Sequence, residues 1–138
     1  MSFKSRTLQI MGVCALAAPL LAFAPAAQAQ DDFSGSWRSN VADHMHMHQD
    51  GDRVTGDFSF RDGQITGHVR DGVLEGIWTQ STSDRRCDES RMGTHYWGHF
   101  FLNLSDDGEK FQGRWSYCED DRGTGGEWHG ERRHHRED

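Results

Sequence analysis

Residues 53–79 read RVTGDFSFRDGQITGHVRDGVLEGIWT, and this stretch decides the fold. Apolar and polar residues alternate along it, and Asp62-Gly63 and Asp71-Gly72 interrupt the alternation. An Asp-Gly pair between two alternating runs is a strong hairpin signal, because the tight turns that join antiparallel strands need positive φ. The stretch therefore predicts three neighbouring antiparallel strands over about 53–60, 64–70 and 73–80.

The same rhythm extends in both directions along the chain. Asp50-Gly51 and Asp107-Gly108 predict two more hairpins, and alternating runs predict further strands over about 33–38, 44–49, 95–104, 110–117 and 127–133. No window has a helical period. We expect a single small all-β domain, an antiparallel up-and-down meander of about eight strands that closes into a β-barrel, because closure removes unpaired edges. A two-sheet sandwich is the alternative.

The N-terminal region has the pattern of a secretory signal peptide. Lys4 and Arg6 precede an apolar run from about Ile10 to Ala24, and small residues follow at Ala27-Gln28-Ala29. The run of roughly 15 residues is shorter than the ~20 that a membrane-spanning helix needs. We therefore predict a signal peptide over residues 1–29, cleavage after Ala29, a barrel over 30–133, a charged tail over 134–138, and a periplasmic or secreted location.

Charge and cysteine content limit the partners and the chemistry. Without Lys4 and Arg6 the 15 basic residues become 13 against 22 acidic ones, a formal charge of −9, so nucleic acid and anionic membranes are poor partners. Cys87 and Cys118 are the only cysteines outside the signal peptide. In an oxidising compartment such a pair usually bonds, and both lie on connections expected at one end of the barrel. We predict a disulfide there and expect any small-molecule site at that end.

Short motifs resemble known barrels. Phe33-Ser34-Gly35-Ser36-Trp37 resembles the G-x-W opening of lipocalins and avidins, and Thr55-Gly56-Asp57-Phe58 resembles the second glycine-aromatic strand of avidins. The lipocalin resemblance implies an arginine packed over the first tryptophan, a part that Arg132 has the parity to play. The polar residues with which avidins hold biotin are replaced here, so biotin binding is not implied.

A closer resemblance is to small exported bacterial proteins of unassigned activity. These share the G-x-W opening, an M-x-(L/M)-x-Q run and a D-G-x-x-(F/V)-x-G run. Here the pattern is carried by Met45-His46-Met47-His48-Gln49, Asp50-Gly51 and Val54-Thr55-Gly56.

The histidines suggest a metal site. The chain has nine of them, and His44, His46 and His48 alternate with Met45 and Met47, so on a strand the imidazoles share one face and the thioethers the other. The parity of neighbouring strands places the methionines in the core. The outward imidazoles, with Asp57 from the next strand, suit a Cu, Ni or Zn ion. A merely solvated histidine face is the alternative.

The aromatic residues suggest a second kind of site. Seven aromatic side chains share the inward parity: Trp37, Phe58, Trp78, Phe100, Trp115, Tyr117 and Trp128. An eight-stranded barrel is just wide enough to be filled by side chains or to hold one small ligand. If it is hollow near one end, Gln80, Tyr96 and Tyr117 are candidate polar contacts. Trp97 and Phe101 have outward parity and predict an exposed apolar patch for a protein partner, unless a shift of register buries them.

These observations favour an exported, non-enzymatic binding module, because no residue set matches a recognisable catalytic motif. Transition-metal binding on the histidine face is the first hypothesis. A lipocalin-like carrier of a small apolar ligand is the second, and a structural or interaction protein is the third.

Overall fold

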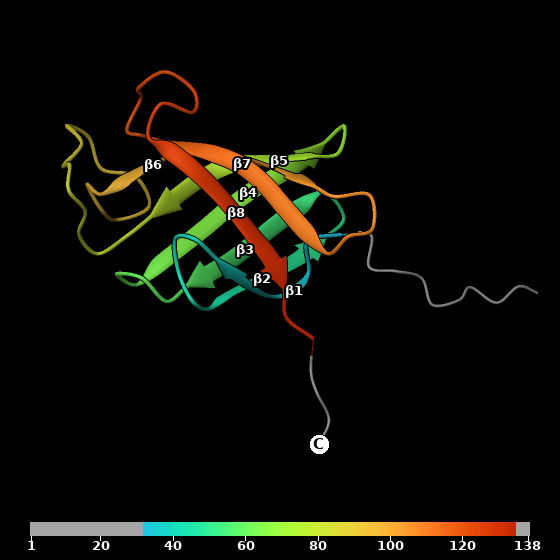
Figure 1. Ribbon diagram of the computed structural model, residues 1–138. Helices are drawn as coiled ribbons and strands as arrows, with labels where there is room; N and C mark the ends of the chain where they lie inside the picture. Colours follow the sequence, from blue (N-terminus) through green and yellow to red (C-terminus); the bar gives the residue numbers. More distant parts are fainter. Residues whose placement is uncertain (1–31, 135–138) are drawn as a thin grey trace, which may run out of the picture.

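The fold is a closed barrel of antiparallel strands (Figure 1). The computed structural model describes residues 32–134. The strands are β1 (Gly35–Ser39), β2 (Met45–Asp50), β3 (Arg53–Phe58), β4 (Gly63–Arg70), β5 (Val73–Thr79), β6 (Trp97–Leu104), β7 (Lys110–Tyr117) and β8 (Gly126–Arg132). Each pairs with the next in the chain, and β8 pairs with β1. The predicted eight-stranded up-and-down barrel is confirmed, and the sandwich is excluded.

The two predicted terminal segments lie largely beyond this barrel. The predicted signal peptide and its cleavage site fall outside the described residues, as does the tail from residue 135 onward. Of that tail only His134 is described, and its Nε2 atom lies 2.5 Å from Oε1 of Glu109. Among residues 32–134, no helix has the length and apolar character to cross a membrane.

The turns follow the Asp-Gly prediction only in part. At Asp71-Gly72 both residues have positive φ, 55° and 82°, as a two-residue hairpin turn requires. At the predicted Asp62-Gly63 turn the residues with positive φ are instead Arg61 and Asp62, and Gly63 already belongs to β4. The prediction of a tight Asp62-Gly63 turn is therefore wrong, and a longer turn over residues 59–62 replaces it.

The reason lies in how glycines and aromatic rings pair across the hairpins. Gly63 is the cross-strand partner of Phe58, and a Cβ atom on Gly63 would overlap the Phe58 ring. The glycine is thus required by packing and not by its φ angle. The same cross-strand pairing joins Trp78 to Gly98, Trp115 to Gly126 and Phe111 to Gly130. Each ring occupies the place that a side chain on the neighbouring strand would fill.

The inward parity read from the sequence is confirmed by burial. Met45 and Met47 are buried in the barrel core, as predicted for the thioether face of β2. The core also contains the inward-facing residues Trp37, Val54, Phe58, Ile65, Leu74, Trp78, Phe100, Leu102, Phe111 and Trp128. Trp115 and Tyr117 are partly buried and pack against it.

One end of the barrel is closed by a cation over a tryptophan. The guanidinium carbon of Arg132 lies 4.3 Å from the centroid of the Trp37 ring, as expected from the sequence. Arg132 also donates hydrogen bonds to the carbonyl oxygens of Asp32, Ser34 and Gly108. Burial lowers the pKa of this guanidinium. Phe111 packs edge-on against Trp37 at 5.1 Å between ring centroids, so this end is filled.

Candidate functional site

The opposite end of the barrel carries the long connections. The segments over residues 40–44, 59–62, 80–96 and 118–125 all leave the strands there, and the two longest project furthest in Figure 1. The predicted disulfide between Cys87 and Cys118 is present, with 5.5 Å between the two Cα atoms, and joins these two longest loops. The sequence prediction that this bond ties one rim of the barrel is therefore confirmed.

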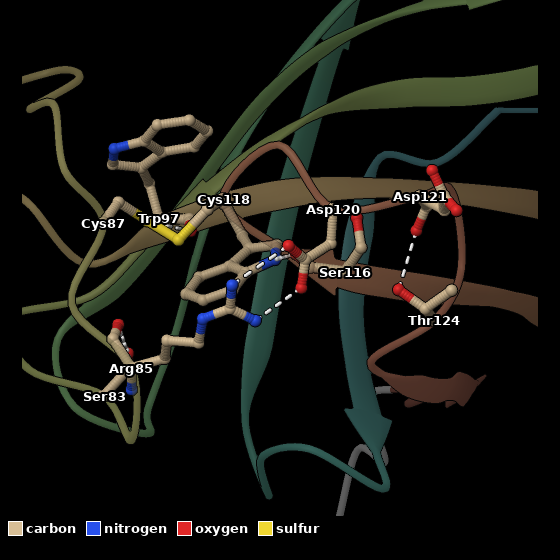
Figure 2. Close-up of polar contacts among 10 residues, drawn as sticks. Ser83, Arg85, Cys87, Trp97, Ser116, Cys118, Asp120, Asp121 and Thr124 are labelled. Atoms are coloured by element: carbon tan, nitrogen blue, oxygen red, sulfur yellow. Dashed lines mark hydrogen bonds and ion pairs between the residues drawn. A yellow bond between two sulfur atoms is a disulfide. The ribbon is translucent and has the colours of Figure 1, made fainter.

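Ion pairs join the same two loops beside the disulfide, and Figure 2 shows the pair of Arg85 and Asp120. Arg85 donates to both carboxylate oxygens of Asp120, at 2.5 and 3.1 Å, and this contact raises the pKa of the Arg85 guanidinium. Arg91 donates to Glu119 at 2.7 Å, and Glu119 also lies 3.0 Å from Nε2 of His99. Glu119 and Asp120 of the shorter loop thus supply carboxylate partners for two arginines of the facing loop.

The long loop over residues 80–96 also buries Trp97. This residue has the predicted outward parity on β6, yet only 2% of it is exposed. Its indole N–H donates to the carbonyl of Glu89 at 2.7 Å, and the Arg91 guanidinium lies 4.6 Å from its ring centroid. Loop residues 81–96 therefore cover it without any shift of register. Phe101 is half-buried, with the Arg122 guanidinium 4.0 Å from its ring centroid. The predicted exposed Trp97/Phe101 patch is wrong, because loop side chains cover both rings.

A cavity of about 190 Å³ lies at the loop-bearing end of the barrel. Aromatic rings form most of its wall, and polar side chains from the loops stand at its rim. The lining residues are Val41, Phe58, Phe60, Arg61, Trp78, Gln80, Ser83, Asp84, Trp115, Tyr117 and Trp128. Trp128 forms part of the floor, where its ring contacts Phe58 and Phe100 edge-on, each at 5.5 Å between centroids. Below that layer the barrel is filled by side chains.

The cavity contains most of the residues that the sequence suggested for a ligand pocket. Phe58, Trp78, Gln80, Trp115, Tyr117 and Trp128 line it. Trp37 does not, because it lies at the closed end under Arg132. Tyr96 does not line it either, although its carbonyl accepts a hydrogen bond from the Gln80 N–H. Sequence reasoning missed the rim residues Val41, Phe60, Arg61, Ser83 and Asp84, which all lie on connections.

An alternation of rings and glycines shapes the wall of this cavity. Phe58 on β3, Trp78 on β5 and Trp115 on β7 are each partnered by a glycine on the following strand. A Cβ atom on Gly98 would lie 2.7 Å from two atoms of the Trp78 indole, and one on Gly126 would lie 3.3–3.4 Å from three atoms of the Trp115 indole. Each indole therefore lies along the wall and does not project across the lumen.

The three histidines at and before β2 do not form a preassembled metal site. His44, His46 and His48 are all exposed, with the predicted outward parity. Nδ1 of His46 lies 3.8 Å from Oδ1 of Asp57, its cross-strand partner. Within residues 32–134 no three His, Cys, Asp or Glu side chains are grouped as metal ligands. The structure brings His46 and Asp57 together and leaves His44 and His48 exposed on the same side, outside any three-residue ligand group of the described residues.

No protein-family model, curated protein or solved structure gives a significant match to this chain.

Proposed function

We propose that this protein binds one small, largely apolar molecule in the aromatic cavity at the disulfide-tied end of its barrel. The observation that carries the proposal is a concave site of about 190 Å³, walled by aromatic rings and edged by a few polar side chains. Small-molecule sites in proteins generally have this composition. The rigid barrel and the tied loops supply a largely preformed shape, which reduces the ordering cost of binding.

The size of the cavity limits the ligand. A dry apolar cavity of about 150 Å³ holds benzene, so this site suits a compact group of about one or two rings in size. Burying about 200 Å² of apolar ligand surface gains about 5 kcal/mol. That free energy is equivalent to a dissociation constant of about 0.2 mM before the cost of association is subtracted and before any polar contact is counted.

The test is a titration followed by tryptophan fluorescence, since three indoles line the cavity. A panel of small apolar compounds is added to the purified protein and to two matched variants. Gln80→Phe fills the rim of the cavity, whereas Gln64→Phe makes the same change on the exposed outer face of β4. We expect saturable quenching in the parent and in Gln64→Phe, and none in Gln80→Phe. Equal binding by both variants, or no saturable binding by the parent across the panel, contradicts the proposal.

A second candidate function is weak binding of Cu(II), Ni(II) or Zn(II) on the outer face of β2. Its support is the 3.8 Å approach of His46 to Asp57, with His48 two positions further along the same face. Two preformed donors on an open surface favour modest affinity, with copper tightest. Protons compete for imidazole, so the metal should be released as pH falls.

Calorimetry tests this second candidate. The double variant His46→Ala/His48→Ala is compared with His68→Ala/His129→Ala, which removes two exposed histidines from β4 and β8. Loss of the heat of copper binding in the first variant alone supports the β2 site. Equal binding by the two variants shows that the β2 histidines are simply solvated.

A further inference from the structure

Three aromatic rings in the cavity stand nearly at right angles to one another. The Trp78 and Trp115 rings lie 6.0 Å apart between centroids with an interplanar angle of 89°. Tyr117 completes the set, at 4.9 Å and 87° from Trp115 and at 6.1 Å and 70° from Trp78. Each pair is arranged edge to face, so the three rings meet at steep angles in the cavity wall.

The glycines behind the rings show which side of each ring lies against the barrel wall. Trp78 lies on Gly98 of β6, and Trp115 lies on Gly125 and on Gly126, the first residue of β8. Neighbouring strands around a closed eight-stranded barrel are turned by about 45°, so supports two strands apart differ by about 90°. The observed 89° between the two indoles agrees with rings lying flat on those two parts of the wall. Their opposite faces are therefore turned toward the lumen.

The spacing of the rings sets the distance to a group placed between them. For perpendicular faces whose centroids are 6 Å apart, a point in front of both lies about 4.2 Å from each centroid, within the ~6 Å range of cation–π attraction. The negative faces of several aromatic rings then act on one positive charge. Aromatic cages of this kind recognise quaternary ammonium groups.

Both acidic and basic side chains stand around the rim of the cavity. Asp84 lines the cavity, and 79% of its side chain is exposed. Its Oδ1 atom lies 3.5 Å from Nη1 of Arg61, which is a loose ion pair. Arg61 is turned onto the exposed ring of Phe60, 4.6 Å from its centroid. Arg85 lies 5.8 Å from the Tyr117 ring centroid but is held by both oxygens of Asp120. The basic side chains at the rim thus have carboxylate partners, and the chain as a whole carries a formal charge of −7, which favours the approach of cations.

From this arrangement we propose that the ligand of the cavity is a compact organic cation, a quaternary or fully alkylated ammonium group, seated between Trp78, Trp115 and Tyr117. The inference rests on the proposed function, since it names the class of molecule that the same cavity takes. The alkyl surface of the cation packs against the apolar wall. Its positive charge is attracted by the ring faces, so it should bind more tightly than a neutral molecule of the same shape. The acidic side chain that lines the cavity is Asp84, which is exposed at the rim and lies 3.5 Å from Arg61.

The test uses three probes of one shape and three charges. Choline carries a trimethylammonium head, 3,3-dimethylbutan-1-ol is its neutral isostere, and 3,3-dimethylbutyrate carries the same tert-butyl head with an anionic group. Each is titrated into the purified protein at low salt and followed by tryptophan fluorescence and calorimetry. We expect choline to bind about tenfold or more tightly than the neutral isostere.

Two surface variants at the rim, neither of which alters the core, test the sign of the charge. We expect Asp84→Asn to weaken choline several-fold and Arg61→Gln to tighten it, with little effect of either on the neutral isostere. A Trp115→Leu variant should lose the preference for choline over the isostere, and a circular dichroism spectrum shows whether it is folded. If it is not folded, the two rim variants still decide.

The other outcomes overturn the inference in distinguishable ways. Equal or tighter binding of the neutral isostere refutes the cation and leaves an apolar ligand. Tighter binding of 3,3-dimethylbutyrate, strengthened by Asp84→Asn, assigns an anionic head held by Arg61. Failure of all three probes while another apolar compound quenches the fluorescence also refutes the cation alone. Failure of every compound removes the proposed function together with the inference.

Discussion

Loss of the Cys87–Cys118 disulfide should cost this barrel a large share of its stability. The bond closes a loop with a sequence separation of 31. In the chain-entropy model such a loop contributes about 3.7 kcal/mol at 25 °C by restricting the unfolded chain. A domain of about 100 residues unfolds with an entropy of about 0.21 kcal/mol/K, so the melting temperature should fall by about 17 °C. Exposed ion pairs between the same loops are worth too little to compensate.

The assay is thermal unfolding followed by circular dichroism, with and without reductant, on the parent and on Cys87→Ala/Cys118→Ala. Cys87 is buried, so the alanine variant also leaves a small hole. Agreement between the reduced parent and the variant therefore isolates the effect of the bond. A fall of less than about 5 °C in both would refute the reasoning, since it would mean that the unfolded chain already holds these loops together. A second readout is ligand quenching at 20 °C, which should weaken on reduction because the loops that carry the rim are no longer tied.

Three further perturbations probe the closed end, the ring supports and a turn. Gly98→Ala should destabilise the protein by about 3 kcal/mol and Gly126→Ala by about 1 kcal/mol in urea unfolding, since only the first places a Cβ atom against a backbone carbonyl as well as an indole. Arg132→Met should cost about 2–4 kcal/mol in the same assay, because it removes the cation over Trp37 and three hydrogen bonds to carbonyl oxygens. Hydrogen bonds from the Glu109 N–H and the Ser105 hydroxyl lower the pKa of Asp107 below 3.8. The stability that Asp107 contributes is therefore present above about pH 4 and lost as pH falls through its folded pKa, so the parent and Asp107→Asn should differ at pH 7 and converge once the pH is below that folded pKa.

The strands could be predicted because their signal is local. Alternation with a period of two fixes which face of a strand is buried, and positive-φ turns mark where strands end. The predicted strand over 110–117 coincides with β7, and the predicted strand over 73–80 differs from β5 by one residue. The inward set also followed directly, since Trp78 and Trp128 lie at the parity of their neighbouring strands.

Two features could not be predicted because they depend on non-local contacts. Gly63 looked like a turn residue, but the ring of Phe58 on the neighbouring strand is what excludes a side chain there. Trp97 looked exposed, since parity describes the sheet and not the loop that covers it. The loop that buries Trp97 is held by the Cys87–Cys118 disulfide and by the hydrogen bond that the Trp97 indole donates to the Glu89 carbonyl. Neither contact has a sequence pattern that gives its geometry.

The rim of the cavity was missed for a related reason. Arg61 and Asp84 come from two different connections and meet only because the barrel brings those connections to one end. A turn at Asp62-Gly63 would have placed Phe60 inside a strand, whereas the longer turn puts it at the cavity mouth with 42% of its surface exposed. Because this turn was predicted in the wrong place, both Phe60 and Arg61 were missed as residues of the candidate site.

The cavity and the stability of the barrel have the same physical origin. A large ring directed toward the axis of so narrow a barrel would fill it, as Trp37 does at the closed end, where it packs edge-on against Phe111. At the mouth, glycines on β4, β6 and β8 instead let the rings of the preceding strands lie sideways on the wall. The rings still bury apolar surface and cover the glycine backbone, so the domain keeps the stabilisation of a packed core while the axis stays open. An alanine at any of these glycines would push its ring toward the axis. Binding and stability should therefore decline together in these variants, whereas in Gln80→Phe, which fills the rim without moving a ring, binding should be lost and stability retained.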